Sequence, residues 1–244
     1  MTANRRYQDV AYDLRKAIAE RGVQVGERLM TERKISEDMG VSRSLVREAL
    51  IMLEIEGLVK VRKGSGIYLV QLPNVKTTID ARDDIGPFEL LQARQILESN
   101  IAGFAAKIVS KNDIIRMREA LELERKGIEN EVGDISGDEL FHRLIAEATQ
   151  NSVLVDTIER LWSQRQKSPM WAQLHGRILD MEYRRSWLND HHAILMALQS
   201  KNSAKAYQAM WQHIENVRET LMKLSDVNDT SFDGYLFQSF NVNS

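Results

Sequence analysis

The sequence contains no cysteine in its 244 residues. Disulfides and thiolate metal sites are therefore excluded, and any metal must be held by histidine and carboxylate side chains. No apolar run approaches the roughly 20 residues that cross a bilayer. The first ten residues, MTANRRYQDV, also lack the apolar segment of a signal peptide. We therefore expect a cytoplasmic protein that does not associate with membranes.

An excess of charge of one sign is also missing, because the formal net charge is only −2. This small value conceals an asymmetry along the chain. Residues 1–76 hold 14 lysines and arginines against 10 aspartates and glutamates, a net charge of +4, whereas the remaining residues carry −6. A weakly basic domain followed by an acidic one is compatible with nucleic-acid binding, and equally with ordinary solvated surfaces.

The first 57 residues have the pattern of three helices. Apolar residues at helical spacing predict a helix over 7–21, and Thr31 is placed to cap a second helix over 32–39. After Gly40, Ser42 is placed to cap a third helix that carries Arg43 and Arg47 on one face. Apolar residues on its other face predict packing against the first two helices.

The next stretch, LVKVRKGSGIYLV, alternates apolar and polar residues on both sides of a glycine-rich turn. This pattern predicts a β-hairpin with a basic tip. Three helices and a hairpin form a winged helix-turn-helix. A small α+β module with no role in nucleic-acid binding would have the same periodicity.

The amino-acid types in this region favour the winged helix-turn-helix over a module with no role in nucleic-acid binding. The run GERLMTERKISEDMGVSRSLVREALIMLEIEGLVKVRKGSGIYLV closely resembles the DNA-binding domain of the GntR family, apart from Met30, where the family usually has proline. The resemblance implies a homodimer that binds a palindromic operator in double-stranded DNA. It assigns DNA contacts to Arg33, Ser42, Arg43, Ser44, Arg47, Lys63 and Gly64, with the two arginines of the third helix in the major groove. Pairing of an arginine with a glutamate such as Glu48 is the structural alternative.

The rest of the chain has the pattern of helices throughout. Residues 73–86 lose apolar periodicity and predict a linker. Helical patterns then begin at Pro87, with Ile96 among the apolar residues at core-facing helical offsets, and at Ser110, where Asp113 is placed to complete a capping box. Further helical patterns cover 137–149, 152–166, 183–199 and 203–224, which predicts an antiparallel bundle. We therefore expect a mainly α protein: a winged helix-turn-helix domain (1–72), a linker (73–86), a helical domain (87–228) and a tail (229–244).

Four residues of the predicted bundle have the chemistry of a metal site. Asp138 and His142 are four residues apart and share a helix face, and His191 and His213 lie on two further helices. From spacing alone, buried histidines that bind no metal are the favoured interpretation of the pattern.

The runs DELFHRLIAEATQN, DHHAILMAL and AMWQHIEN resemble the FCD domain of the FadR subfamily of GntR regulators. In that subfamily the matching aspartate and histidines hold a divalent metal, usually zinc or nickel. The resemblance also implies that Arg94 points into an effector cavity, where its guanidinium would bind a carboxylate. Pairing of Arg94 with Glu98 on the same helix is the alternative. His175 and His192 lie outside the pattern.

Further runs, including GPFELLQARQILESNIAGFAA and SPMWAQLH, resemble the hexuronate-responsive branch of these regulators. The implied effector is a small sugar acid. Gln95 and Asn151 are weaker candidates to contact its hydroxyls. A capping or solvated role is the alternative for both residues. Core packing is the favoured interpretation of Trp171, Trp187 and Trp211. We expect a repressor released by its effector. An activator, or a metalloenzyme acting on sugar acids, is the alternative.

Overall fold

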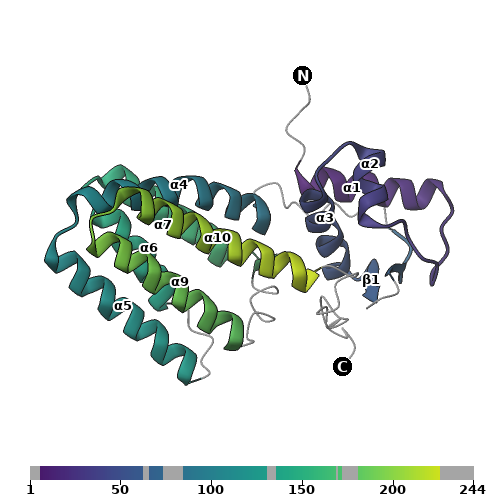
Figure 1. Ribbon diagram of the computed structural model, residues 1–244. Coiled ribbons are helices and arrows are strands. Elements are labelled where there is room, and N and C mark those ends of the chain that lie inside the picture. Colours follow the sequence, from purple (N-terminus) through teal and green to yellow (C-terminus); the bar gives the residue numbers. More distant parts are fainter. Residues whose placement is uncertain are drawn as a thin grey trace. The chain divides into compact units, whose positions relative to one another are not determined.

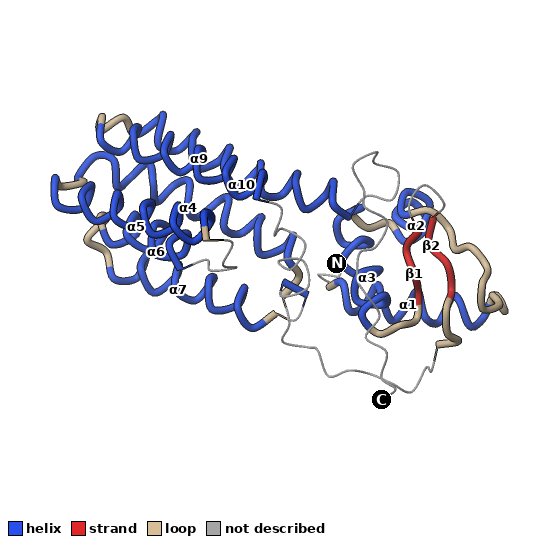
Figure 2. The backbone as a smooth tube through the Cα atoms, turned by 90° about the horizontal axis from the view of Figure 1, so that it is seen from below, coloured by secondary structure: helices blue, strands red, loops and turns tan. Residues whose placement is uncertain are grey.

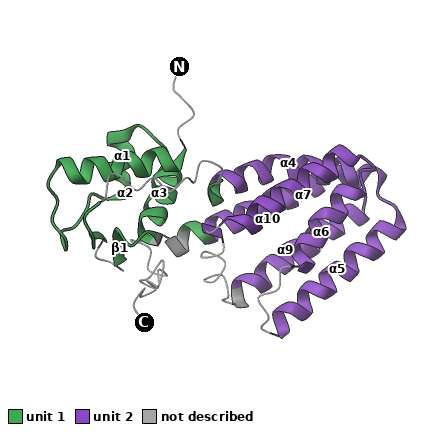
Figure 3. Ribbon diagram, turned by 180° about the vertical axis from the view of Figure 1, so that it is seen from behind, with its two compact units in different colours: residues 1–88, 221–244 green, residues 89–220 purple. Residues whose placement is uncertain are grey.

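The computed structural model describes residues 6–62, 66–73, 85–130, 136–168, 170–171 and 181–225 (Figures 1 and 2). The chain divides into two compact units (Figure 3), one built from residues up to Phe88 together with those from Leu221 onward, the other from Glu89–Thr220. Lys63, Gly64, most of the expected linker and the expected tail 229–244 lie outside the described residues.

The first unit contains the expected winged helix-turn-helix. Its elements are α1 (Tyr7–Glu20), α2 (Glu32–Met39), α3 (Arg43–Ile55), β1 (Val59–Arg62) and β2 (Gly66–Leu69). Thr31 caps α2 by accepting a hydrogen bond from the Lys34 amide at 3.3 Å. Gly40 ends α2 in the left-handed conformation with φ 64°, which a residue without a Cβ adopts without strain. Ser42 caps α3 in the same way as Thr31 caps α2.

The apolar faces of these elements form one core. Leu14 and Ile18 of α1, Ile35 of α2, and Leu50 and Leu53 of α3 are all buried, as their spacing predicts. The two strands pair antiparallel, side by side in Figure 2, with Val59 opposite Leu69 and Val61 opposite Ile67. These four side chains are buried, so one face of the hairpin closes the core.

The second unit is a bundle of helices, confirming the expected fold class. Its helices are α4 (Pro87–Ile108), α5 (Lys111–Glu129), α6 (Ser136–Glu147), α7 (Ser152–Lys167), α9 (Met181–Gln199) and α10 (Ser203–Ser225). The start of α4, up to Phe88, and the end of α10, from Leu221, are counted with the first unit. Ser110 and Asp113 form the predicted capping box at the start of α5. Among the described residues, no helix has both the length and the apolar character needed to span a membrane.

One expected core position in α4 is wrong. Ile96 was expected to face inward, but its side chain is 50% exposed. The inward face of α4 carries Arg94, Gln95 and Glu98 instead, and all three are buried. A stripe of buried polar side chains therefore replaces part of the apolar stripe, which is why apolar spacing assigned Ile96 to the wrong face of α4. Buried charges at this density must be paired, and their partners form the site described next.

Candidate metal site and DNA-contacting helix

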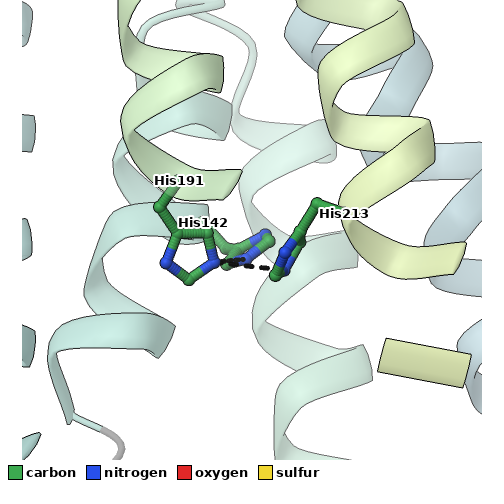
Figure 4. A group of neighbouring side chains, drawn as sticks. All are labelled: His142, His191 and His213. Carbon is green, nitrogen blue, oxygen red and sulfur yellow. Dashed lines mark hydrogen bonds between the residues drawn. The ribbon is translucent and has the colours of Figure 1, made fainter. Parts of the chain in front are cut away.

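Three histidines from three helices converge in the interior of the bundle (Figure 4). His142 comes from α6, His191 from α9 and His213 from α10, and each is at most 3% exposed. The Nε2 atom of His191 lies 3.3 Å from Nε2 of His142 and 3.1 Å from Nε2 of His213. The same nitrogen of all three rings therefore faces one common point.

Asp138 adds an oxygen to this group. It lies one helical turn before His142 on α6, and its Oδ1 is 3.5 Å from His142 Nε2 and 3.7 Å from His191 Nε2. The structure thus brings together the four residues that the sequence predicted as ligands. Three imidazole nitrogens and one carboxylate oxygen are a donor set suited to a divalent ion such as Zn²⁺.

A carboxylate lies behind each histidine, and none of these carboxylates was predicted from the sequence. Glu98 of α4 contacts Nδ1 of His142, and Glu124 of α5 accepts a hydrogen bond from Nδ1 of His191 at 2.8 Å. Asp190 lies 3.5 Å from Nδ1 of His213. Carboxylates at this position keep the proton on Nδ1 and leave the Nε2 lone pair for a metal, as in many metal sites with histidine ligands.

Burial and the neighbouring charges set the protonation of these groups. Burial, followed by the neighbouring His191, lowers the pKa of His213 to about 3, and burial also lowers the pKa of His142. Burial acts the same way on His191, but Glu124, Asp138 and Asp190 together outweigh it, so the pKa of that ring is raised. Burial raises the pKa of Asp138, but Arg165 and the histidines lower it well below its usual range. His142, His213 and Asp138 are thus held in the forms that bind metal.

The charges of the cluster provide a separate test of whether a metal fits. Four carboxylates, from Glu98, Glu124, Asp138 and Asp190, surround the histidines, whereas two guanidinium groups, from Arg94 and Arg165, are paired with them. With neutral imidazoles, the four carboxylates and two guanidinium groups sum to an excess of two negative charges, which a divalent cation would neutralise. The residues therefore fit a divalent metal.

Arg94 lies in the same region. It lines a cavity together with Glu124, Asp138, Arg165, Trp171, Trp187, His191, His213 and Val217. Its Nε and Nη2 donate to the two carboxylate oxygens of Glu98 at 2.6 and 3.4 Å. The structure therefore shows the pair with Glu98 that the sequence left open. Although burial raises the pKa of Glu98, Arg94 and His142 lower it to about 2, so this carboxylate is ionised.

Arg165 is a second arginine of this cavity that the sequence did not identify. Its Nη1 donates to Oδ2 of Asp138 at 3.1 Å, while the guanidinium lies over the rings of Trp162 and Trp171 at 4.6 and 5.0 Å. No motif marks this residue, because its partner is 27 positions away on another helix. Trp171 is buried as expected, whereas Trp211 is 37% exposed and stacks on Tyr207.

Two weaker candidates for effector contacts lie elsewhere. The amide of Gln95 donates to the Trp211 carbonyl and to Glu215 on α10, at 3.2 and 3.0 Å. Asn151 caps α7 by accepting from the Val153 amide at 3.0 Å. Neither is among the described residues that line the cavity. The capping alternative therefore describes Asn151 in this structure, and ligand contact by either residue stays a prediction.

In the first unit, four of the predicted DNA-contacting residues gather at the first turn of α3 and on α2. The side chains of Arg33 and Arg43 are 80% and 50% exposed. The hydroxyls of Ser42 and Ser44 lie 3.0 Å apart at the amino end of α3, where free amides and the helix dipole favour phosphate.

The structure corrects the expected exposure of Arg47. This side chain is only 1% exposed, and its Nε donates to Oε1 of Glu32 at 2.9 Å. Arg47 lies one turn after Arg43, on the side of α3 that packs against α2, so its guanidinium reaches the first residue of α2. Its predicted place in the major groove is therefore not available to it in this conformation.

Comparison with known proteins identifies both parts of the chain. Residues 6–69 match the family of bacterial regulatory proteins called gntR, and residues 89–216 match the FCD domain. The Uxu operon regulator of Haemophilus influenzae is 49% identical over 97% of this chain and 89% of that protein. The Uxu operon transcriptional regulator of Escherichia coli K12 is 49% identical over 98% of this chain and 95% of that protein. The Exu regulon transcriptional regulator of the same strain is 44% identical over 96% of this chain and 91% of that protein. The chain belongs to the GntR family of DNA-binding transcriptional regulators and carries an FCD effector domain behind its winged helix-turn-helix.

Proposed function

We propose that this chain represses genes of hexuronate and related sugar-acid catabolism and leaves its operator when a sugar acid binds. The observation that carries the proposal is the pairing of two features in one chain. One is a helix with exposed Arg43 and Ser42 at its amino end, and the other is a buried cluster of histidines, aspartate and arginines suited to a carboxylate ligand. Relatives named as Uxu and Exu regulators, similar over nearly the whole chain, support the choice of genes.

On the DNA, Arg43 would bind a guanine in the major groove through two parallel hydrogen bonds. Ser42, Ser44 and Arg33 would hold the flanking phosphates, and Lys63 and Gly64 would bring the wing to the duplex. A homodimer would place two such helices on a palindromic operator, with half-sites about one helical turn apart. The proposed boundaries are a DNA-binding domain over 1–72, a linker over 73–86, an effector domain over 87–228 and a tail over 229–244.

In the effector domain, His142, His191, His213 and Asp138 would hold a divalent metal, zinc or nickel. When bound, such an ion supplies positive charge and one or two open coordination positions for an oxygen ligand. Arg94 would bind the effector carboxylate, and Gln95 and Asn151 remain candidates for its hydroxyls. The effector can shift the protein away from DNA only if it binds the two states with unequal affinity.

Selection of DNA from a random pool tests the proposed reading of an operator. Purified protein should enrich a short palindrome, and its affinity for that duplex should fall steeply as salt rises, because phosphate contacts release counterions. Replacement of Arg43 with alanine should weaken the enrichment and relax the selected sequence at the base that Arg43 contacts. A selection that returns no common sequence at low salt would contradict the proposal.

A further inference from the structure

The cavity beside the histidines holds two guanidinium groups whose hydrogen bonds differ. Arg94 and Arg165 both line it, at 3% and 8% exposure, and both lie over the ring of Trp162, at 4.3 and 4.6 Å from its centre. Two buried cations so close to each other are costly unless each has an anion. Each has one in this structure, Glu98 for Arg94 and Asp138 for Arg165.

The two pairs leave different donors available. Arg94 uses the edge formed by Nε and Nη2, since both nitrogens donate to Glu98. Arg165 donates to Asp138 only through Nη1, and no described residue accepts a hydrogen bond from its Nε or Nη2. A carboxylate binds arginine best through two parallel N–H groups of one edge. Such an edge is committed on Arg94 and open on Arg165.

The surroundings of Arg165 keep that edge in place. The rings of Trp162 and Trp171 are buried and lie against the guanidinium, which limits the orientations that the planar group can take. Asp138 anchors one end of the group, and Oδ1 of the same carboxylate faces the histidines. An arginine fixed in this way loses little entropy when it binds a ligand.

We propose that Arg165 is a second effector-binding residue, whose Nε and Nη2 edge binds the carboxylate of a sugar acid beside the histidine cluster. The inference rests on the proposed function and adds to it the residue that selects for an acid over a neutral sugar. Arg94 keeps its pair with Glu98, so it can reach the same effector carboxylate only through Nη1.

Isothermal titration of the zinc-loaded, full-length protein with glucuronate, galacturonate and glucose tests this assignment. In Arg165→Lys, the ammonium keeps a positive charge beside Asp138 but loses the planar edge. We expect this variant to bind zinc as the wild type does and to bind the acids about 10- to 100-fold more weakly. Arg160→Gln, an exposed position on the same helix, is the matched control and should bind both acids normally.

Two results would overturn the assignment. One is binding of both acids by Arg165→Lys and Arg165→Gln within twofold of the wild type. The other is normal binding of acids by Arg165→Lys together with loss of zinc from Arg165→Gln, which would make Arg165 only a support for Asp138.

Failure of the proposed function itself gives a different result. If the wild type binds neither hexuronate, the proposed class of effector is wrong, and titration with acetate tests Arg165 alone. Acetate should change the tryptophan fluorescence of the wild type, through Trp162 and Trp171, and should have about tenfold less affinity for Arg165→Lys. A wild type that does not respond to acetate would overturn the assignment of Arg165 as well.

Discussion

The Nδ1 nitrogen of His191 donates a hydrogen bond to Oε2 of Glu124, 2.8 Å away on a neighbouring helix. This contact ties α5 to α9 and directs the other ring nitrogen toward the rings of His142 and His213. Because the same arrangement, with a carboxylate behind the ring, recurs at all three histidines, the geometry of the cluster depends on residues that are not themselves candidate ligands.

Replacing Glu124 with glutamine should weaken zinc binding without removing a ligand. The amide oxygen can still accept from His191, but the negative charge that strengthens the ring as a ligand is lost. We expect the zinc dissociation constant to rise about 10- to 100-fold, measured by competition with a chelating dye. Glu122→Gln, an exposed change on the same helix, should leave it unchanged. His191→Ala should lower the metal content outright, and unchanged stoichiometry in that variant would refute the site.

The two arginines of α3 should respond differently to alanine substitution. Arg43→Ala removes an exposed group, so it should weaken operator binding by about 1–3 kcal/mol and leave stability unchanged. Arg47→Ala leaves the buried carboxylate of Glu32 without its main partner, so it should lower the free energy of unfolding by about 3 kcal/mol. Fluorescence anisotropy with the selected duplex and urea unfolding measure the two effects. Equal losses of stability in both variants would contradict this division of roles.

Arg94→Lys should weaken the response to effector while leaving DNA binding intact. Lysine keeps a charge near Glu98 but has no planar group that can pair with Glu98 and reach the effector carboxylate at the same time. The concentration of hexuronate that releases half of the DNA should rise about tenfold. The readout is effector titration of the protein–duplex complex. A normal response would remove Arg94 from the effector site, and a loss of affinity for DNA would mean that the substitution disturbs the fold.

The metal-free protein should lose stability as pH falls below about 6.5. The pKa of His213 is lowered from 6.5 to about 3, so between these values the unfolded chain takes up a proton that the folded one does not. His142 acts in the same sense, whereas the raised pKa of His191 acts in the opposite sense. The pKa of Glu98, lowered from 4.5 to about 2, adds a further loss in more acidic solution.

The lowered pKa values of His213 and His142 favour proton uptake on unfolding, and the raised pKa of His191 opposes it. Unfolding should therefore take up a net proton at mildly acidic pH. The free energy of unfolding should then fall by about 1.4 kcal/mol per pH unit for each net proton. Urea unfolding of chelator-treated protein at pH 7.5, 6.5 and 5.5 measures this slope, and His213→Gln should reduce it. A stability that rises toward acid would show that the histidines are charged in the folded state.

Periodicity and capping predicted both units, because helices and hairpins depend on residues close in sequence. Thr31, Ser42 and Ser110 cap the helices that their spacing assigned to them. The four candidate ligands are brought together as predicted, two by their spacing on one helix and two through the resemblance to the FCD domain. Helical spacing says nothing about contacts between helices that are distant in sequence. The resemblance to a family predicts such contacts only for the residues of its motifs.

The residues that were missed make their contacts with distant helices and belong to no motif. Glu124 and Arg165 find their partners 67 and 27 positions away, and in sequence each is an ordinary charged residue of an amphipathic helix. The burial of Arg47 was missed for a related reason, because spacing along α3 does not show that α2 places Glu32 against it. Ile96 was misplaced since buried ion pairs, which hydrophobic patterns cannot show, occupy the inward face of α4.

The most direct test of the central claim is release of DNA by a sugar acid that depends on the histidine cluster. Zinc-loaded protein is bound to its selected duplex, and fluorescence anisotropy is followed as glucuronate or galacturonate is added. At least one of these acids should lower the anisotropy to that of free duplex, and His213→Ala should remain on the DNA at the same concentrations. Full retention of DNA by the wild type in both acids, or equal release from His213→Ala, would contradict the account.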